Sequence, residues 1–274
     1  MSHEKFPVCS HNGKIIPIEE AQISVQNIEF SYGFGVYETI RIADGTPLFL
    51  DDHCKRLMHS ASVIGRKHPF DANQITEWIK ELTQDIKEER YNVKMLLIGS
   101  PEPERVQLFI LPLMPRFPDK RLYKKGADVI TVEYERPFPT AKTLSMLPSY
   151  IAYHKAAGKG CYEALSVHKD GNIAEGTRSN FLAIKNGAIL TPPKEKMLSG
   201  ITWEHLLEIA KEEGVDVHEQ DIPLASIHEL DGAILTSSSG KVMPIRKIDE
   251  TELPEIPEVT RTLMEKYDEL LASK

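Results

Sequence analysis

Residues of three kinds, spread over the chain, are suited to covalent and anion-binding chemistry. Lys142 is a candidate nucleophile, because a lysine amine becomes a nucleophile and a base when burial lowers its pKa. Arg56 carries a guanidinium fork, which matches the geometry of a phosphate. Ile201 and Thr202 open a predicted helix, and the N–H groups of a helix start bind anions. The local motifs HExxH, GxSxG, GxGxxG and the Walker lysine loop are absent.

These residues belong to three groups of short motifs. The first group is Ser31-Tyr-Gly-Phe-Gly-Val-Tyr-Glu-Thr-Ile-Arg41, Gly45, His53-Cys-Lys-Arg56-Leu57 and Ser60-Ala61. The second is Lys142-Thr-Leu-Ser, Gly160-Cys-Tyr-Glu163-Ala164-Leu165 and Glu175-Gly176-Thr-Arg178-Ser-Asn180-Phe181. The third is Leu190-Thr-Pro-Pro193, Leu198-Ser-Gly200-Ile-Thr202, Leu235-Thr-Ser-Ser238 and Pro244-Ile. Each piece alone is common by chance, so the interpretation depends on their joint occurrence.

In order and spacing, from about Asn12 to Ile248, these motifs resemble the fold-type-IV pyridoxal-phosphate enzymes. That family comprises branched-chain aminotransferases, D-amino-acid aminotransferases and aminodeoxychorismate lyases. The resemblance implies pyridoxal 5'-phosphate as the cofactor and an α/β (α+β) chain with a small N-terminal α/β domain and a larger, strand-rich pseudo-barrel domain. It also implies a homodimer with active sites at the interface, and ping-pong transfer between amino acid and 2-oxo acid substrates.

The resemblance also assigns roles to single residues. It makes Lys142 the Schiff-base lysine and Glu175 the carboxylate that keeps the pyridine nitrogen protonated. The implied phosphate ligands are Arg56, the backbone N–H groups of Ile201 and Thr202, and donors from Ser237 and Ser238. The ordinary alternatives are a solvated lysine, a surface acid, a solvent-facing arginine, a plain N-cap and a polar turn.

Substrate-binding residues are less clearly marked. Tyr32 and Tyr37 match aromatic positions that line the substrate side in the family, although core or interface aromatics are the ordinary alternative. D-amino-acid enzymes hold the substrate carboxylate with an Arg-x-His pair, but the matching stretch here has only Arg105 and no histidine. We therefore expect Arg178 to bind the carboxylate bidentately. Arg90 or Lys94 would assist it, unless Arg178 faces solvent or pairs with a structural acid.

The choice of amino donor depends on a few positions. Branched-chain enzymes carry a tyrosine five residues after the lysine, where this chain has Leu147. The segments after Lys142 and after Gly160 are closer to D-amino-acid enzymes. These features favour a transaminase that moves the amino group of a D-amino acid such as D-alanine to 2-oxoglutarate. A branched-chain L-amino-acid aminotransferase, an aminodeoxychorismate lyase and a non-catalytic cofactor-binding relative remain alternatives, and Trp203 receives no functional role.

Turn signals and helical periodicity define the elements that must position these residues. Hairpins are predicted at Asn12-Gly13, Asp44-Gly45, Asp170-Gly171 and Asn186-Gly187. Helices are predicted over 52–64 with Asp51 as N-cap, after Asp71, over 145–157, over 202–213 and from about Pro257. The prolines between Leu111 and Pro118 predict an interdomain connection. The domains would be residues 1–117 and 118–274.

Composition excludes several classes of protein. The net charge of −8 disfavours non-specific binding to nucleic acid. No run of about 18 apolar residues predicts a membrane span, and the first residues show no apolar signal core. The scattered histidines and the three cysteines, without a CxxC pair, predict neither a metal site nor a disulfide framework. We therefore expect a cytoplasmic enzyme without a metal.

Overall fold

The computed structural model describes residues 5–115 and 117–274, and the chain divides into two compact units. Unit 1 contains Met1–Arg116 and Ala141–Met146, and unit 2 contains Phe117–Thr140 and Leu147–Lys274. The sequence prediction placed the whole of 118–274 in one domain. The segment Ala141–Met146, which carries Lys142, groups with unit 1 because Thr143 pairs with Val36 and the Leu144 N–H donates to the Gly35 carbonyl over 2.9 Å.

Unit 1 is built on one sheet with the strand order β2-β1-β6-β5-β3-β4. The strands are β1 (Val8–His11), β2 (Lys14–Pro17), β3 (Gly35–Ala43), β4 (Thr46–Pro47), β5 (Arg90–Ile98) and β6 (Gln107–Leu113). Short helical segments are η1 (Ile18–Glu20), α1 (Ile28–Ser31) and η2 (Pro103–Arg105). Long antiparallel pairing of β3 with β5, and of β5 with β6, makes the centre of this sheet a regular platform.

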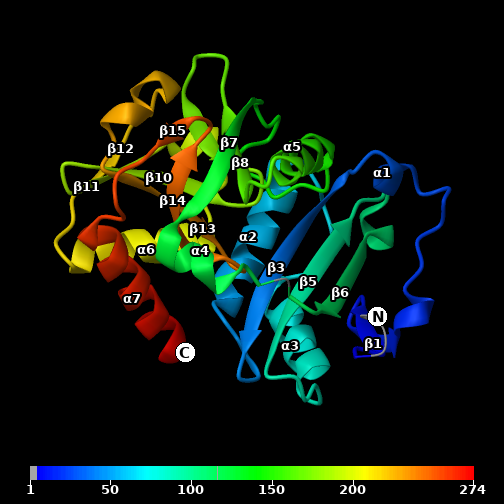
Figure 1. Cartoon of the computed structure of the whole chain (residues 1–274). Helices are drawn as coiled ribbons and strands as arrows, with labels where there is room; N and C mark the ends of the chain where they lie inside the picture. Colours follow the sequence, from blue (N-terminus) through cyan, green and yellow to red (C-terminus); the bar gives the residue numbers. More distant parts are fainter. Residues whose placement is uncertain (1–4, 116) are drawn as a thin grey trace. The chain divides into compact units, whose positions relative to one another are not determined.

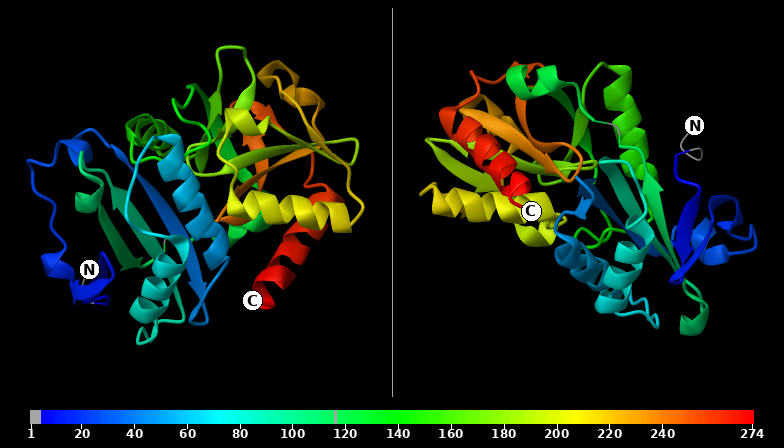
Figure 2. Two further views of the ribbon diagram at one scale, coloured as in Figure 1. Left: turned by 180° about the vertical axis from the view of Figure 1, so that it is seen from behind. Right: turned by 90° about the horizontal axis from the view of Figure 1, so that it is seen from below.

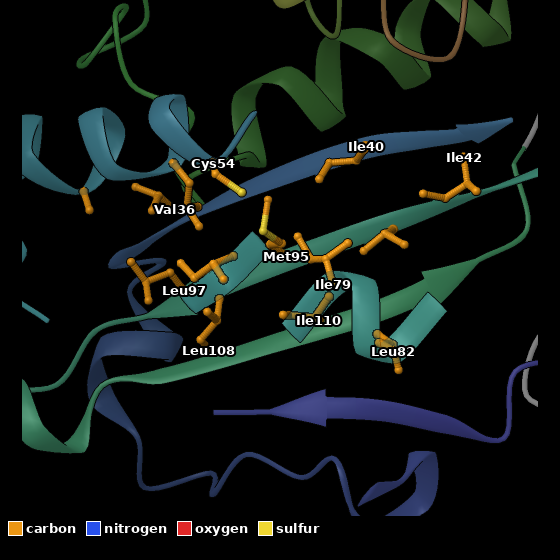
Figure 3. Close-up of a cluster of buried hydrophobic side chains, with 14 of the residues drawn as sticks. Val36, Ile40, Ile42, Cys54, Ile79, Leu82, Met95, Leu97, Leu108 and Ile110 are labelled. Carbon is orange, nitrogen blue, oxygen red and sulfur yellow. The ribbon is translucent and has the colours of Figure 1, made fainter. Parts of the chain in front are cut away.

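Two helices cover one face of this sheet, α2 (Leu50–Val63) and α3 (Ala72–Thr83) (Figure 1). Alternate residues of β3, β5 and β6 point toward them, as Val36, Met95 and Ile110 do in Figure 3. The helices contribute Cys54 and Ile79 to the same cluster. This period-two pattern of buried side chains holds α2, and therefore Arg56, against β3.

Unit 2 contains a barrel-like sheet. Its strands are β7 (Ala127–Glu133), β8 (Glu163–Val167), β9 (Ile173–Gly176), β10 (Asn180–Lys185), β11 (Ala188–Thr191), β12 (Val217–Glu219), β13 (Gly232–Ser237), β14 (Lys241–Ile248) and β15 (Thr251–Glu252). The pairing runs β10-β13-β14-β7-β8-β9, and the pairing of β9 with β10 closes the ring. The predicted mixed α/β fold with a strand-rich pseudo-barrel is confirmed.

Helices surround this barrel: α4 (Lys120–Lys125), α5 (Leu147–Gly158), α6 (Ile201–Glu212) and α7 (Glu258–Ala272), with the short η3 (Lys194–Lys196) and η4 (Leu224–Glu229). Helix α5 packs on β8, and α6 packs on β13. Helices α6 (yellow) and α7 (red) lie side by side, as both views of Figure 2 show. No helix in the described part of the chain is long and apolar enough to cross a membrane.

Most predicted elements occur where expected. The four predicted turns join β1 to β2, β3 to β4, β8 to β9 and β10 to β11. Asp71 caps α3 with a capping box, and its side chain accepts the Gln74 N–H over 2.9 Å. The prediction that Asp51 caps a helix is wrong, because α2 begins at Leu50 after Phe49, which has a left-handed backbone. Helix α5 begins two residues later than predicted because Ser145 and Met146 belong to unit 1.

The predicted proline-rich connection begins later than expected. Pro112 lies within β6 and pairs with Val93 of β5. The opposite edge of β6 pairs with β1 only through Phe109 and Ile110, so Pro112 lies beyond this pairing. A proline without an N–H is therefore compatible with this end of the strand. Arg116, inside the predicted connection, lies outside the described residues.

Candidate active site

The backbone of Lys142 is held between β3 and α2 within unit 1. Its carbonyl accepts the Tyr37 N–H over 2.9 Å, and its own N–H donates to Oγ of Ser60 over 3.1 Å. Gly35 allows this close approach, because a Cβ there would lie 2.8 Å from Cδ1 of Leu144. The Lys142 amine lies 4.8 Å from the centre of the Tyr37 ring. The segment therefore presents one amine on the face of one aromatic ring.

Arg56 is fixed by a buried carboxylate. Its Nε donates to Oε1 of Glu38 over 2.6 Å, and its Nη2 donates to Oε2 over 2.9 Å. His53 Nδ1 lies 2.9 Å from Glu38 Oε2, and the Glu38 and His53 side chains are both buried. His53, Arg56 and Ser60 are three and four residues apart on α2, so one helix face holds all three contacts.

The electrostatics of this cluster follow from burial and charge. Burial alone would raise the pKa of Glu38, but the Arg56 charge and the hydrogen bonds of His53 and Arg56 hold that pKa far below its usual value. Burial lowers the pKa of His53 despite the Glu38 charge. His53 is therefore neutral near pH 7 and donates Nδ1–H to an ionised Glu38, so its contact is a hydrogen bond and not an ion pair.

Glu175, on β9 of unit 2, is also fixed on every side. Its Oε1 pairs with Nη2 of Arg136, and its Oε2 accepts the Leu198 N–H over 3.2 Å. The hydroxyl of Ser166 donates to the Glu175 carbonyl over 2.9 Å and lies 3.3 Å from its N–H. Only 8% of the Glu175 surface is exposed. Its carboxylate is thus a rigid, nearly dry acceptor of hydrogen bonds.

The N-terminus of α6 offers donors without a side-chain cap. Gly200 is the N-cap residue and makes no side-chain cap hydrogen bond, and Ile201 and Thr202 follow as the first helical residues. A Cβ on Gly200 would collide with Oδ1 of Asn180. The Asn180 side chain donates to the Leu198 carbonyl over 2.6 Å, which fixes the approach to the helix. The first-turn N–H groups of a helix and the helix dipole favour an anion at this end.

Ser237 ends β13, and Ser238 follows it in the turn to β14. Ser237 Oγ accepts the Gly240 N–H over 3.0 Å, and the Gly240 carbonyl accepts the Tyr123 hydroxyl over 3.0 Å. Burial raises the pKa of the neighbouring Tyr162 to about 12, so its hydroxyl stays a neutral donor. The turn therefore carries several hydroxyl groups and a tightly held backbone.

The three features of unit 2 meet at one place on the barrel. Asn180 of β10 pairs with Glu175 on one side and with Thr236 on the other. Its side chain also holds the segment before α6. The carboxylate, the helix N-terminus and the end of β13 are thus neighbours. A carboxylate beside anion-binding donors fits a ring N–H and a phosphate on one small molecule.

The predicted substrate residues of unit 1 are not all together. Lys94 Nζ lies 5.3 Å from the centre of the Tyr37 ring, and the Tyr37 hydroxyl lies 3.5 Å from Met146 Sδ. Arg90 pairs with Ala43 at the other end of β5, six residues from the partner of Tyr37, or about 20 Å along the strand. Tyr32, after α1, is 82% exposed. Within unit 1 the structure groups Lys94 with Tyr37 and separates Arg90 from them.

Arg178 lies in unit 2, stacked on α5. Its guanidinium carbon is 3.8 Å from the centre of the Tyr153 ring, and its Nε is 4.0 Å from Oε2 of buried Glu163. The hydroxyls of Thr177 and Ser179 bind the same Glu163 carboxylate. The Arg178 side chain is 48% exposed, so its contacts leave it accessible to solvent. Arg105, in contrast, is 78% exposed and pairs with Glu102.

Several structural roles escaped the sequence prediction. Glu38, His53 and Arg136 hold the candidate Arg56 and Glu175, although none was assigned a role. The one sequence feature that could have drawn attention to Arg136 is its position six residues before Lys142. Trp203 also gains an explanation, because it is buried and its Nε1 donates to Oγ1 of Thr191 over 2.9 Å. Its role is core packing with a satisfied indole.

Comparisons with known proteins define the family. The chain matches amino-transferase class IV over residues 35–248. A putative branched-chain-amino-acid aminotransferase of Methanocaldococcus jannaschii is 28% identical over 277 positions, and the match covers 94% of each chain. A D-alanine aminotransferase of Bacillus licheniformis is 29% identical over 248 positions, covering 87% of each.

Solved structures give the same result. A branched-chain aminotransferase of Thermoproteus uzoniensis, with norvaline, has a TM-score of 0.88 and 25% identity, over 97% of this chain and 95% of that chain. Another solved branched-chain amino acid aminotransferase, with pyridoxamine 5'-phosphate, has a TM-score of 0.90 and 25% identity, over 98% of this chain and 95% of that chain.

The chain belongs to the class IV aminotransferases. The cofactor of this family is pyridoxal phosphate, and its members act on an amino acid and a 2-oxo acid. The predictions of family, fold and cofactor are therefore confirmed. The relatives include both D-alanine and branched-chain aminotransferases at similar identity, so the amino donor stays a prediction.

Proposed function

We propose that this protein transfers the amino group of a D-amino acid, such as D-alanine, to 2-oxoglutarate by a ping-pong mechanism. The grouping of Glu175 with the uncapped N-terminus of α6 and the Ser237 turn carries the cofactor part of this proposal. Pyridoxal phosphate, when bound, supplies an aldehyde that takes up amino groups and a protonated ring that accepts electrons.

The residues divide the work by their chemistry. Lys142 would hold the aldehyde and, once its amine is released, move a proton to and from the substrate Cα. Glu175 would accept the ring N–H. Arg56, Ile201, Thr202, Ser237 and Ser238 would bind the phosphate, the first by charge and the others by N–H and O–H donors. Glu38 supports this role because it fixes the plane of the Arg56 guanidinium.

We propose that Lys94 and Arg178 bind the substrate carboxylate, and that Tyr32 and Tyr37 line the substrate site. Arg178 is supported by its exposed, stacked guanidinium, which Tyr153 orients without using all of its donors. Lys94 is supported by its place over the same Tyr37 ring as Lys142. Arg90 has the weakest support, because β5 carries it away from that ring.

The test of the carboxylate residues is a half-reaction titration. Arg178→Ala should raise the half-saturating concentration of D-alanine about tenfold or more, because a charge-assisted hydrogen bond contributes about 1.5–3 kcal/mol. Arg246→Ala serves as a matched control, since Arg246 is a similarly exposed arginine of unit 2, paired with Asp128. Saturation of Arg178→Ala at wild-type concentrations would refute its role and leave Lys94 to be tested in the same way.

The preference for a D-amino donor rests on two observations. Leu147 stands where branched-chain enzymes carry a tyrosine, and the Bacillus licheniformis D-alanine aminotransferase is 29% identical. A branched-chain L-amino-acid aminotransferase is the second candidate, favoured by the match with the Methanocaldococcus jannaschii protein. An aminodeoxychorismate lyase is the third, and it would release pyruvate without a 2-oxo acid acceptor.

Paired donors decide among these candidates. Purified holoenzyme is mixed with D-alanine, L-alanine, D-leucine or L-leucine, and loss of the visible absorbance of bound cofactor is followed. We expect D-alanine to remove this absorbance and 2-oxoglutarate to restore it, with Lys142→Ala as the inactive control. Conversion by L-leucine alone would establish the branched-chain candidate and contradict ours.

We also propose that the chain forms a homodimer through α5. Leu147, Tyr150 and Ile151 lie on one face of this helix, and each is between 58% and 68% exposed. A second copy that covered these side chains would remove apolar surface from water. Sedimentation should give a dimer for the wild-type chain and a monomer for Tyr150→Glu/Ile151→Glu. A wild-type monomer at micromolar concentration would contradict the proposal.

A further inference from the structure

Arg136 makes an ion pair that differs from most of the others in the chain. Its Nη2 contacts Glu175 Oε1, with side chains 16% and 10% exposed. Ordinary surface pairs, such as Lys80–Glu77, have side chains 59% and 70% exposed. Exposed pairs contribute little, whereas a nearly dry carboxylate needs a counter-charge to stay ionised. The pair therefore bears on the protonation of Glu175.

The fold fixes where this arginine lies. The chain leaves β7 at Glu133, and the Tyr134 N–H donates to the Val167 carbonyl at the end of β8 over 3.0 Å. This bond extends the β7–β8 pairing by one step and carries Arg136 to β9, the next strand. The Tyr134 hydroxyl is buried without a hydrogen-bond partner in the described residues, which indicates that little water reaches this side of Glu175.

The pair also has a consequence for any positive group that binds Glu175. A carboxylate has about four lone-pair sites, so Glu175 can accept from Arg136, from the Leu198 N–H and from a further donor. A second positive charge close to the carboxylate makes it a weaker base, and two positive charges that share it repel each other. Arg136 therefore limits how strongly Glu175 can stabilise a protonated ring.

We propose that Arg136 is a positioning residue that keeps Glu175 ionised and oriented, and that it thereby lowers the proton affinity of the cofactor's ring nitrogen. The part of this inference that concerns the ring nitrogen rests on the proposed function. Without Arg136, Glu175 would turn toward other donors and would hold the ring proton more tightly.

The test measures the titration of the Glu175 carboxyl and that of the cofactor's ring nitrogen in Arg136→Gln. Arg136→Lys is the conservative variant. Arg121→Gln is the control, since Arg121 pairs with Asp119 on the surface of the same unit. Carbon-13 NMR of the Glu175 carboxyl in the cofactor-free full chain is assigned with Glu175→Gln. Nitrogen-15 NMR of ring-labelled pyridoxal phosphate follows the ring in the holoenzyme. Arg136→Gln should raise the pKa of Glu175 by about 1–3 units and also raise that of the ring nitrogen. Arg136→Lys should lie between it and the wild type.

The outcomes separate this inference from the proposed function. If the wild type binds the cofactor and both titrations are unchanged in Arg136→Gln, the role of Arg136 is wrong and the function stands. If the wild type binds no cofactor, the proposed function fails, and the ring-nitrogen half fails with it. The Glu175 titration in the free chain still decides the first half. If Arg136→Gln does not fold, Arg136→Lys decides, and its titrations must differ from the wild type.

Discussion

Replacing Glu38 by glutamine should destabilise unit 1 by about 3–5 kcal/mol, the cost of breaking a buried ion pair from one side. Glu38 has no exposed surface, and Arg56 lies against it with a side chain only 10% exposed. The substitution removes the charge that faces the guanidinium and weakens both of its bonds at 2.6 and 2.9 Å. His53 has no negative form near neutral pH, so it cannot replace that charge.

The assay uses the two tryptophans of the chain, one in each unit. In a Trp203→Phe background, Trp78 on α3 is the remaining tryptophan, and it packs against the core of unit 1. Urea unfolding followed by its fluorescence then reports unit 1. Glu102→Gln is the matched control, because Glu102 pairs with Arg105 on the surface of the same unit and its loss should leave the midpoint unchanged.

A double variant separates charge from packing. In Glu38→Gln/Arg56→Met neither side chain is charged, so unit 1 should regain part of the lost stability. If Glu38→Gln unfolds at the same urea concentration as Glu102→Gln, the pair does not carry the stability assigned to it. If the loss of stability in the double variant equals the sum of the losses in Glu38→Gln and Arg56→Met, the two residues do not act as a pair.

Three further predictions concern other parts of the chain. The contribution of His53 to the stability of unit 1 should be fully present above the ordinary histidine pKa of about 6.5 and should be lost as the pH falls below that value, because the pKa of His53 is lowered in the folded chain and the unfolded chain binds the proton first. The urea midpoint of His53→Gln should vary less with pH, and an unchanged pH profile would contradict the burial argument. Gly200→Ala should weaken binding of pyridoxal phosphate at least about tenfold, because the Asn180 contact shifts the start of α6; spectral titration measures it, and wild-type affinity would refute the role of α6. Trp203→Phe should cost unit 2 about 1–3 kcal/mol, since buried Thr191 loses its donor; calorimetry measures it, and an unchanged unfolding temperature would show that water replaces the indole.

Local signals predicted most of the elements, because each depends on a few adjacent residues. Asn12-Gly13 and Asn186-Gly187 adopt the positive φ angles that their types favour. The α3 stripe of Ile75, Ile79 and Leu82 is buried, as its spacing predicts. The Asp51 prediction was wrong because tertiary packing places Phe49 at the helix start with a left-handed backbone, which no propensity favours.

Long-range contacts were beyond local signals. Nothing near Lys142 shows that its segment pairs with Val36 and binds Ser60, since those partners are about a hundred residues away in sequence. The roles of Glu38 and Arg136 likewise depend on residues brought together by strand pairing. The family motifs identified candidate residues for the site, whereas the residues that hold them in place were identified only from the structure.

The most direct measurement of the central claim asks which amine carries the cofactor. Holoenzyme is reduced with borohydride, digested, and the labelled peptide is sequenced by mass spectrometry. The label should lie on Lys142 and be absent in Lys142→Ala, while Lys94→Ala should still be labelled at Lys142. Lys94 is the informative alternative, because its amine lies over the same Tyr37 ring. A label on Lys94, or visible cofactor absorbance that survives in Lys142→Ala, would contradict the account.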